Sequence, residues 1–270
     1  MQVGAFRFGE IRLTVFEVGR FEMSVGDLFG AVPPGELAAA CARHQITTDP
    51  VEFRMLPFIA DLGDRRVVID PGGHGDPTPM RAGLAEAGIA PESIDAVVIT
   101  HGHLDHYGGC IAADGSPLFS RAKHFIQRAE WEHWIGDESG DAYQAENFRR
   151  FLEPMAEHFT LMEGDGEVVP GIEAIMTPGH SPGHMVVKVA DVAVHTGDAL
   201  LTSVCVEHPE WVARWEARGE QVVESRRRLL TLMADEDLLA MLSHMPFPGV
   251  GRARARADGW EWLREPLGAS

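Results

Sequence analysis

The sequence THGHLDH at residues 100–106 places three histidines and one aspartate within six positions. The apolar run 94–99 directly precedes it, and its length and β-branched content are typical of a buried strand. Two glycines at 108–109 follow, so we expect the polar stretch to form a tight loop leaving that strand. Imidazole nitrogens and carboxylate oxygens are ligands of zinc and similar ions. The stretch therefore predicts a metal site at a strand end.

Three more short apolar runs each end in a loop with a histidine or an aspartate: 172–176 before His180, 192–195 before Asp198, and 238–242 before His244. Loops at strand ends commonly carry the chemistry of α/β scaffolds. The candidate metal ligands are therefore His101, His103, Asp105, His106, His180, Asp198 and His244. Seven protein ligands, one of them bridging, suffice for two divalent metal ions with open positions for water.

The composition is that of an ordinary globular chain, with 45% hydrophobic and 24% charged residues among 270. A net charge of −18 disfavours nucleic acid as a partner, because phosphate binding needs a basic patch. No apolar run approaches the ~20 residues that span a membrane, so we expect no membrane partner. The cysteines, Cys41, Cys110 and Cys205, form no CxxC pair. We therefore expect reduced thiols and a cytoplasmic protein.

The periodicity predicts an α/β fold in a single domain over residues 1–270, because no repeat or linker divides the chain. Strands are expected at 11–18, 51–62, 66–69, 94–99, 123–127, 172–176, 186–189, 192–195 and 238–242. Helices are expected at 36–43, 79–87, 128–134, 144–158 and 220–234. Segment 19–50 either covers a cleft, contacts a second subunit in a homodimer, or forms a surface excursion.

Four motifs, in this order, resemble those of the metallo-β-lactamase-fold hydrolases: HGHLDH at 101–106, TPGHSPGH at 177–184, HTGDA at 195–199 and SHMPFPG at 243–249. The resemblance runs from about residue 51 to 250, and spacing, order and local sequence all agree. It implies a four-layer αββα sandwich with the site at one edge of two sheets. It also implies one metal ion on His101, His103 and His180, a second on Asp105, His106 and His244, and a bridge by Asp198.

Differences from parts of that family narrow the resemblance. Asp198 stands where zinc β-lactamases commonly have Cys, and His103 where iron–flavin oxygen reductases usually have Glu. The tail 244–249 is similar to methyl parathion hydrolase and related esterases, whereas N-acyl-homoserine lactone lactonases share all seven ligands. Many of those lactonases have a substrate-contacting Tyr three residues after the bridging Asp. Leu201 stands there in this chain, which predicts a preference for other, lipophilic substrates.

The resemblance also implies supporting residues around the metals. Asp70 ends a strand where the family has a carboxylate that hydrogen-bonds a ligand histidine, although a turn residue before a proline is an equally good interpretation. His184 and His195 fit supporting roles better than ligation. The remaining histidines are expected at the surface or in packing: His44, His74, His124, His133, His158 and His208. Four aromatic residues are expected in the core or at an interface, with a pocket wall as the alternative: Trp131, Trp134, Phe148 and Phe151.

Together these residues predict a dinuclear hydrolase for a small, neutral or lipophilic substrate. Two divalent ions, zinc before Mn, Fe or Co, would supply metal-bound hydroxide to cleave an ester or lactone. Asp105 can orient this nucleophile and carry its proton to the leaving group. The alternatives are a phosphotriesterase of the methyl parathion hydrolase type and a glyoxalase II-like thioesterase. Two alternatives belong to other classes: a mononuclear iron dioxygenase, and a metal-binding or interaction protein without enzymatic activity.

Overall fold

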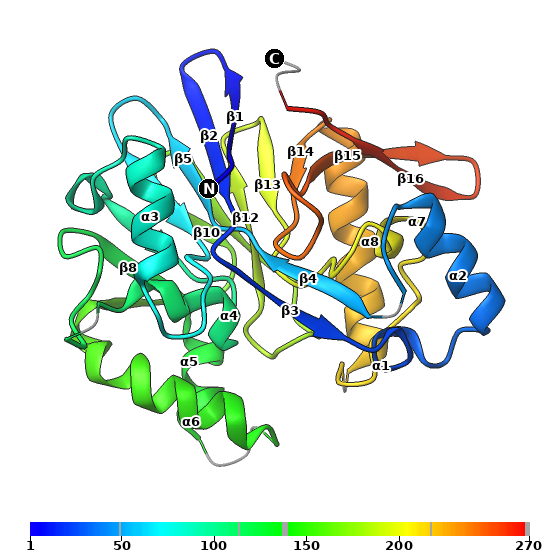
Figure 1. The fold of residues 1–270 in the computed structure, drawn as a ribbon, viewed down its shortest axis with the longest axis horizontal. Coiled ribbons are helices and arrows are strands. Elements are labelled where there is room, and N and C mark those ends of the chain that lie inside the picture. The colour runs from blue at the N-terminus through cyan, green and yellow to red at the C-terminus, as the bar shows by residue number, and fades with distance from the viewer. Residues whose placement is uncertain (49, 113, 137–139, 217, 268–270) are drawn as a thin grey trace.

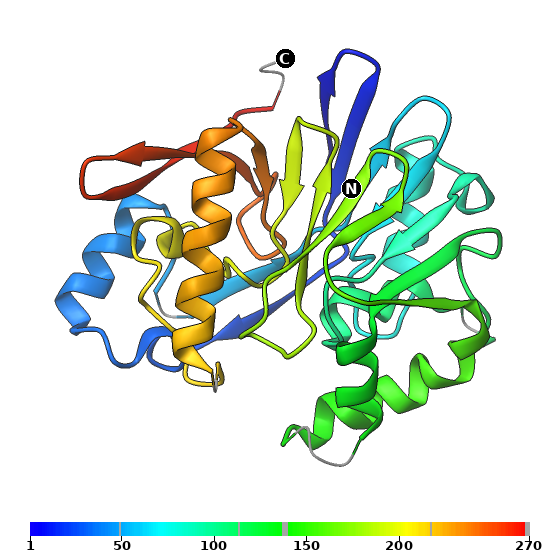
Figure 2. The ribbon, with the colours of Figure 1, turned by 180° about the vertical axis from the view of Figure 1, so that it is seen from behind.

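The computed structural model describes residues 1–48, 50–112, 114–136, 140–216 and 218–267. Two seven-stranded sheets stack face to face, and helices cover the outer face of each (Figures 1 and 2). The chain therefore has the four layers of the expected αββα sandwich. In the part of the chain that the structure describes, no helix is long and apolar enough to cross a membrane.

The first sheet has the order β1-β2-β5-β6-β7-β8-β9. Its strands are β1 (Val3–Phe8), β2 (Ile11–Phe16), β5 (Phe58–Asp61), β6 (Arg66–Ile69), β7 (Ala96–Val98), β8 (Lys123–Gln127) and β9 (Phe159–Met162). Pairing is antiparallel from β1 to β6 and parallel from β6 to β9. Its helices and short 3₁₀ turns are α3 (Thr78–Glu86), η1 (Pro91–Ser93), α4 (Leu104–Tyr107), η2 (Gly108–Cys110), α5 (Arg128–Ile135), α6 (Ala142–Phe151) and η3 (Glu153–His158).

The second sheet has the order β10-β11-β12-β13-β14-β15-β16. Its strands are β10 (Gly166–Val169), β11 (Ile172–Met176), β12 (Met185–Val189), β13 (Ala193–His195), β14 (Leu239–Met241), β15 (Val250–Arg256) and β16 (Gly259–Arg264). β13 and β14 pair in parallel, so a crossover must join them, and α7 (Val204–Glu207) and α8 (Gly219–Asp235) provide it. With α2 (Pro34–Arg43), these helices cover the outer face.

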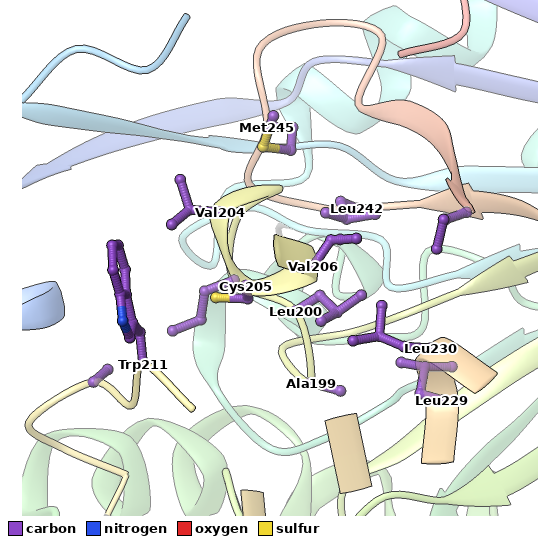
Figure 3. Close-up of a cluster of buried hydrophobic side chains, with 14 of the residues drawn as sticks. Ala199, Leu200, Val204, Cys205, Val206, Trp211, Leu229, Leu230, Leu242 and Met245 are labelled. Carbon is purple, nitrogen blue, oxygen red and sulfur yellow. The ribbon is translucent and has the colours of Figure 1, made fainter. Parts of the chain in front are cut away.

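Three apolar layers hold the sandwich together. The central layer lies between the sheets and joins residues such as Val67 and Val98 to Val187 and Met241. A second layer packs α3 to α6 on the first sheet. The third packs α2, α7 and α8 on the second sheet, where Leu229 and Leu230 of α8 approach Leu200 (Figure 3). Burial of this apolar surface is the main stabilising contribution to the fold.

The segment 19–50 contains two elements that the sequence did not predict, β3 (Gly19–Met23) and α1 (Val25–Phe29). β3 pairs with β4 (Val51–Met55) in a separate two-stranded ribbon. The single strand expected at 51–62 is therefore wrong, because it divides into β4 and β5. Pro57 lies between them and has no N–H with which to continue a ladder.

Two further expectations need correction. The helix expected at 144–158 ends at Phe151 and is followed by η3, whose first turn contains Pro154 and cannot extend the hydrogen-bonding pattern of α6. The stretch 100–106 is not wholly a loop, because Asp105 and His106 lie on the helical turn α4. Four residues are too few to show helical periodicity in a sequence.

Candidate metal centre

One group of side chains that could hold a metal ion comprises His101, His103, His180 and Asp198, whose donor atoms lie within 4.8 Å of one another. His101 and His103 follow β7, and His180 follows β11 of the other sheet. His103 Nδ1 lies 3.0 Å from His101 Nε2 and 3.1 Å from His180 Nε2. Nitrogens bound tetrahedrally at a zinc-like distance would be about 3.3 Å apart. The three imidazoles therefore converge as ligands of one ion would.

A second group comprises Asp105, His106 and His244. Asp105 Oδ2 lies 3.7 Å from His106 Nε2 and 3.5 Å from His244 Nε2. The first two side chains come from α4, and His244 follows β14 of the second sheet. Each group thus combines residues from both sheets.

Asp198 lies between the two groups. Its Oδ1 is 3.3 Å from His106 Nε2 and 3.1 Å from His244 Nε2. Its Oδ2 is 3.4 Å from His180 Nε2 and 3.9 Å from His101 Nε2. One oxygen therefore faces each group, which is the arrangement that a bridging carboxylate needs.

Buried polar atoms support the fit of metal ions. Among the described residues, His106 Nε2 and Asp198 Oδ1 are buried without a hydrogen bond of acceptable geometry. Such atoms are costly to leave unsatisfied, and these two lie 3.3 Å apart beside the second group. The donor set is hard oxygen and borderline nitrogen, which suits zinc and similar divalent ions.

The electrostatics divide the histidines into two kinds. Burial lowers the pKa of His101 well below its usual value and that of His103 to about 3, and neighbouring histidines add to the effect. Both rings therefore stay neutral and keep a lone pair for a metal ion. Burial also opposes a charge on His106 and His244, but the nearby carboxylates, Asp198 foremost and Asp105 with it, together outweigh burial and raise the pKa of both. A divalent cation can replace protons held in this way.

Asp70 orients ligands on the first sheet. Its Oδ2 lies 2.7 Å from His106 Nδ1, and its two oxygens accept hydrogen bonds from Thr100 N at 2.8 Å and Thr100 Oγ1 at 2.6 Å. Thr100 Oγ1 lies in turn 3.1 Å from His101 Nδ1. Because these contacts occupy the Nδ1 atoms, the Nε2 atoms of both rings are left to face Asp198 and the candidate metal site.

Hydrogen bonds also orient ligands on the second sheet. His244 Nδ1 lies 2.7 Å from the carbonyl oxygen of Arg54, which leaves Nε2 toward Asp198. His184 is buried beneath this region, where its Nε2 accepts a hydrogen bond from Asp198 N at 2.9 Å. His184 Nδ1 lies 2.9 Å from Thr177 Oγ1, so both ring nitrogens are used inside the protein.

The sequence interpretation missed a buried ion pair behind His180. Glu216 Oε1 lies 3.6 Å from His180 Nδ1 and 3.0 Å from Arg226 Nη2, and both charged side chains are 0% exposed. Burial opposes the charge on Glu216, but Arg226, His180 and the backbone N–H of Ala213 together outweigh it and lower the pKa of the carboxyl. The sequence did contain a signal for a buried charge, because Arg226 follows Val222 by one helical turn and so falls on the buried face of α8.

A cavity of about 460 Å³ opens onto both groups. One part of its wall is apolar and is formed by Phe21, Met23, Phe53 and Leu201. Elsewhere the lining includes His133, Trp134, Asp141, Gln144, Trp215 and Arg218. His133, expected at the surface or in packing, thus lines the cavity. Of the four aromatic residues expected in the core, Trp134 is both buried and part of this wall.

Known proteins resemble the chain in sequence and in fold. An N-acyl homoserine lactonase of Bacillus cereus is 30% identical over 165 residues, which cover 60% of this chain and 60% of that protein. Against the corresponding lactonase of Bacillus thuringiensis, the match spans 41% of that protein's length. The fold is similar to that of AbOPH, a hydrolase in the beta lactamase superfamily, with a TM-score of 0.87 and 20% identity over 98% of this chain and 97% of that one.

A second solved structure is AidC, a dizinc quorum-quenching lactonase, with a TM-score of 0.86 and 19% identity over 98% of this chain and 97% of that one. At such identities the structures show the shared fold alone. The family model of the Metallo-beta-lactamase superfamily matches residues 58–244, which include both groups of donor side chains. The chain therefore belongs to the metallo-beta-lactamase superfamily.

Proposed function

We propose that this protein is a hydrolase that binds two divalent metal ions, with zinc as the first candidate, and cleaves an ester or lactone. The observation that carries the proposal is the convergence of the two donor groups on Asp198 beside an open cavity. His101, His103 and His180 would hold one ion, Asp105, His106 and His244 the other, and Asp198 both. When bound, two such ions supply Lewis acidity and lower the pKa of water.

The chain's own residues would position the substrate and move the proton. Asp105 lines the cavity with a 15% exposed side chain, so it can accept a proton from the attacking water. The same carboxylate can return that proton to the departing alkoxide, which is general acid–base catalysis. Asp70, His184 and Glu216 would fix the orientation of the ligand residues through their hydrogen bonds and close contacts.

The apolar wall supports a substrate with an uncharged, lipophilic group. Phe21 and Phe53 stack with ring centroids 5.3 Å apart, and both meet the His244 ring edge to face. An aryl or alkyl group bound here would lie beside the ion on His244. Since Phe21 belongs to β3, we propose that segment 19–50 covers the cleft, as one interpretation of the sequence expected.

A substrate panel on metal-replete protein tests the proposal. The panel should contain an aryl ester, an alkyl-substituted lactone, an N-acyl homoserine lactone, a phosphotriester and a thioester. We expect turnover of the first two that is abolished by a chelator and restored by zinc. If the protein instead cleaves the phosphotriester or the thioester fastest, that compound class would replace esters and lactones as the proposed substrate. A covalent acyl adduct on a serine or cysteine would contradict hydrolysis by activated water.

A further inference from the structure

Glu130 is a buried carboxylate that lines neither the cavity nor either donor group. It lies in the first turn of α5 and is 0% exposed. Its Oε1 accepts hydrogen bonds from Gly102 N at 2.9 Å and Trp134 Nε1 at 2.5 Å. Its Oε2 accepts hydrogen bonds from Ser181 Oγ at 2.8 Å and Gly183 N at 2.9 Å. These four donors compensate the desolvation of the charge.

The two oxygens of Glu130 hold two different ligand loops. Oε1 binds the backbone between His101 and His103, on the loop that leaves the first sheet. Oε2 binds the loop that begins at His180 and leaves the second sheet. A single side chain therefore joins the loops whose imidazoles form the first donor group.

The loops approach α5 so closely that only glycine fits at the points of contact. A Cβ atom on Gly102 would lie 2.2 Å from the Trp134 ring, and one on Gly183 would lie 2.3 Å from the backbone nitrogen of Glu130. Contacts this short are not tolerated without a shift of the backbone. The loops are thus pressed onto the helix, where Glu130 can control their separation.

We propose that Glu130 is a positioning residue for the metal ion of the first donor group. It touches no ligand atom and acts by setting the distance between the loops, so that His103 Nδ1 and His180 Nε2 stay 3.1 Å apart. The proposal rests on the proposed metal centre. Removal of a residue that holds metal ligands in place typically lowers the metal affinity by about 10–100-fold.

The test is Glu130→Gln, which keeps the shape but presents an NH₂ donor to one of the two loops. The matched control is Gln127→Leu, because Gln127 is also buried and its side chain bonds, among the described residues, to Gly164 and to the sulfur of Met185 in β12. Zinc is removed stepwise with a competing chelator, and unfolding is measured in parallel. We expect one of the two zinc ions to bind about 10–100-fold more weakly in Glu130→Gln alone.

Hydrogen exchange of the metal-free proteins gives a readout that needs no ion. Exchange within 100–106 and 179–183 should be about 10–100-fold faster in Glu130→Gln than in wild type, as expected for loss of hydrogen bonds to a charged group. The control should exchange there at the wild-type rate. Should Glu130→Gln fail to fold, Ser181→Ala removes one donor to the same carboxylate and should show smaller changes in the same direction.

Unchanged zinc affinity and exchange in both variants would overturn the role of Glu130. Equal weakening of both ions in Glu130→Gln and Gln127→Leu would also overturn it, because a general loss of stability would then explain the effect. These readouts do not depend on hydrolysis. Wild-type protein that binds two ions but cleaves no ester or lactone would contradict the proposed activity and not the positioning role.

Discussion

Asp198 is the residue on which both donor groups depend, because each of its oxygens faces a different group. If Asp198 bridges two ions, the substitution Asp198→Ala should weaken the binding of both ions. Asp105 belongs to the second group alone, so Asp105→Ala should weaken one ion. Elemental analysis of the purified variants after zinc loading measures this directly. Loss of a single ion in Asp198→Ala would show that the carboxylate does not bridge.

Leu201 offers the cavity only apolar surface, and it is 2% exposed. A tyrosine hydroxyl there could donate a hydrogen bond to the developing oxyanion, a contact typically worth about 10²–10³ in rate. We therefore expect wild-type protein to cleave aryl esters and alkyl lactones with higher kcat/KM than unsubstituted homoserine lactones. Leu201→Tyr should narrow or reverse that ranking, whereas Leu201→Phe, which adds the ring alone, should not.

The outcome to look for is a ratio of kcat/KM values rather than a single rate. Wild-type protein that strongly prefers acyl-homoserine lactones would show that Leu201 does not set specificity.

At the residue scale, the sequence predicted best where the signal is local. All seven candidate ligands converge in the structure, because each belongs to a short motif at a strand end. Glu130, Glu216 and His133 were missed, because their partners lie on other elements and no spacing links them to the motifs. Burial of a charged residue is visible in a sequence only when it interrupts a helix's apolar face, as Arg226 does.

At the scale of elements, β8 contains a histidine whose burial makes stability depend on pH. His124 is fully buried in the first sheet, and both ring nitrogens lack a hydrogen-bond partner among the described residues. Burial, with a contribution from His158, lowers its pKa to about 4. The unfolded chain takes up the proton near pH 6.5, whereas the folded chain resists it. Stability is therefore complete above pH 6.5 and is lost as the pH falls toward 4.

His124→Phe should remove this part of the pH dependence. A shift of this size corresponds to about 3 kcal/mol between pH 7 and pH 4. Urea unfolding of metal-free wild type and variant at several pH values measures it, and the difference at pH 8, where both side chains are neutral, gives the packing effect of the substitution. If the free energies of unfolding of the two proteins fall in parallel down to pH 4, the assignment of this pH dependence to His124 is wrong.

The elements that the sequence predicted are those with a clear pattern of buried apolar residues, such as β11 and α8. The hairpin between β5 and β6 was also predicted correctly from Gly63 and its neighbour. β3 and α1 were missed, since β3 buries none of its five residues fully and α1 is little more than one helical turn. The separation of β4 from β5 depends on tertiary pairing, because β4 pairs with β3 whereas β5 pairs with β2 in the first sheet. A single sequence does not show which partner a strand will find.

At the scale of the whole molecule, the donor groups join the two halves of the sandwich. His101, His103, Asp105 and His106 come from the first sheet's side, and His180, Asp198 and His244 from the second's. Apolar contacts between the sheets already hold these halves together. Ions bound at the edge of the sheets would add to that association, because their ligands cannot stay in place if the sheets separate.

Metal removal should therefore lower the stability of the whole fold. An ion present at 100 times its Kd stabilises the native state by about 2.7 kcal/mol, so two ions acting independently would contribute about twice that. We expect chelation to lower the Tm by about 10 °C and zinc to restore it. Asp105→Ala keeps the first donor group intact, so its Tm should rise less on zinc addition than the Tm of wild type. Identical Tm values with chelator and with excess zinc would mean that the donor groups hold no ion in the native state, whatever their geometry.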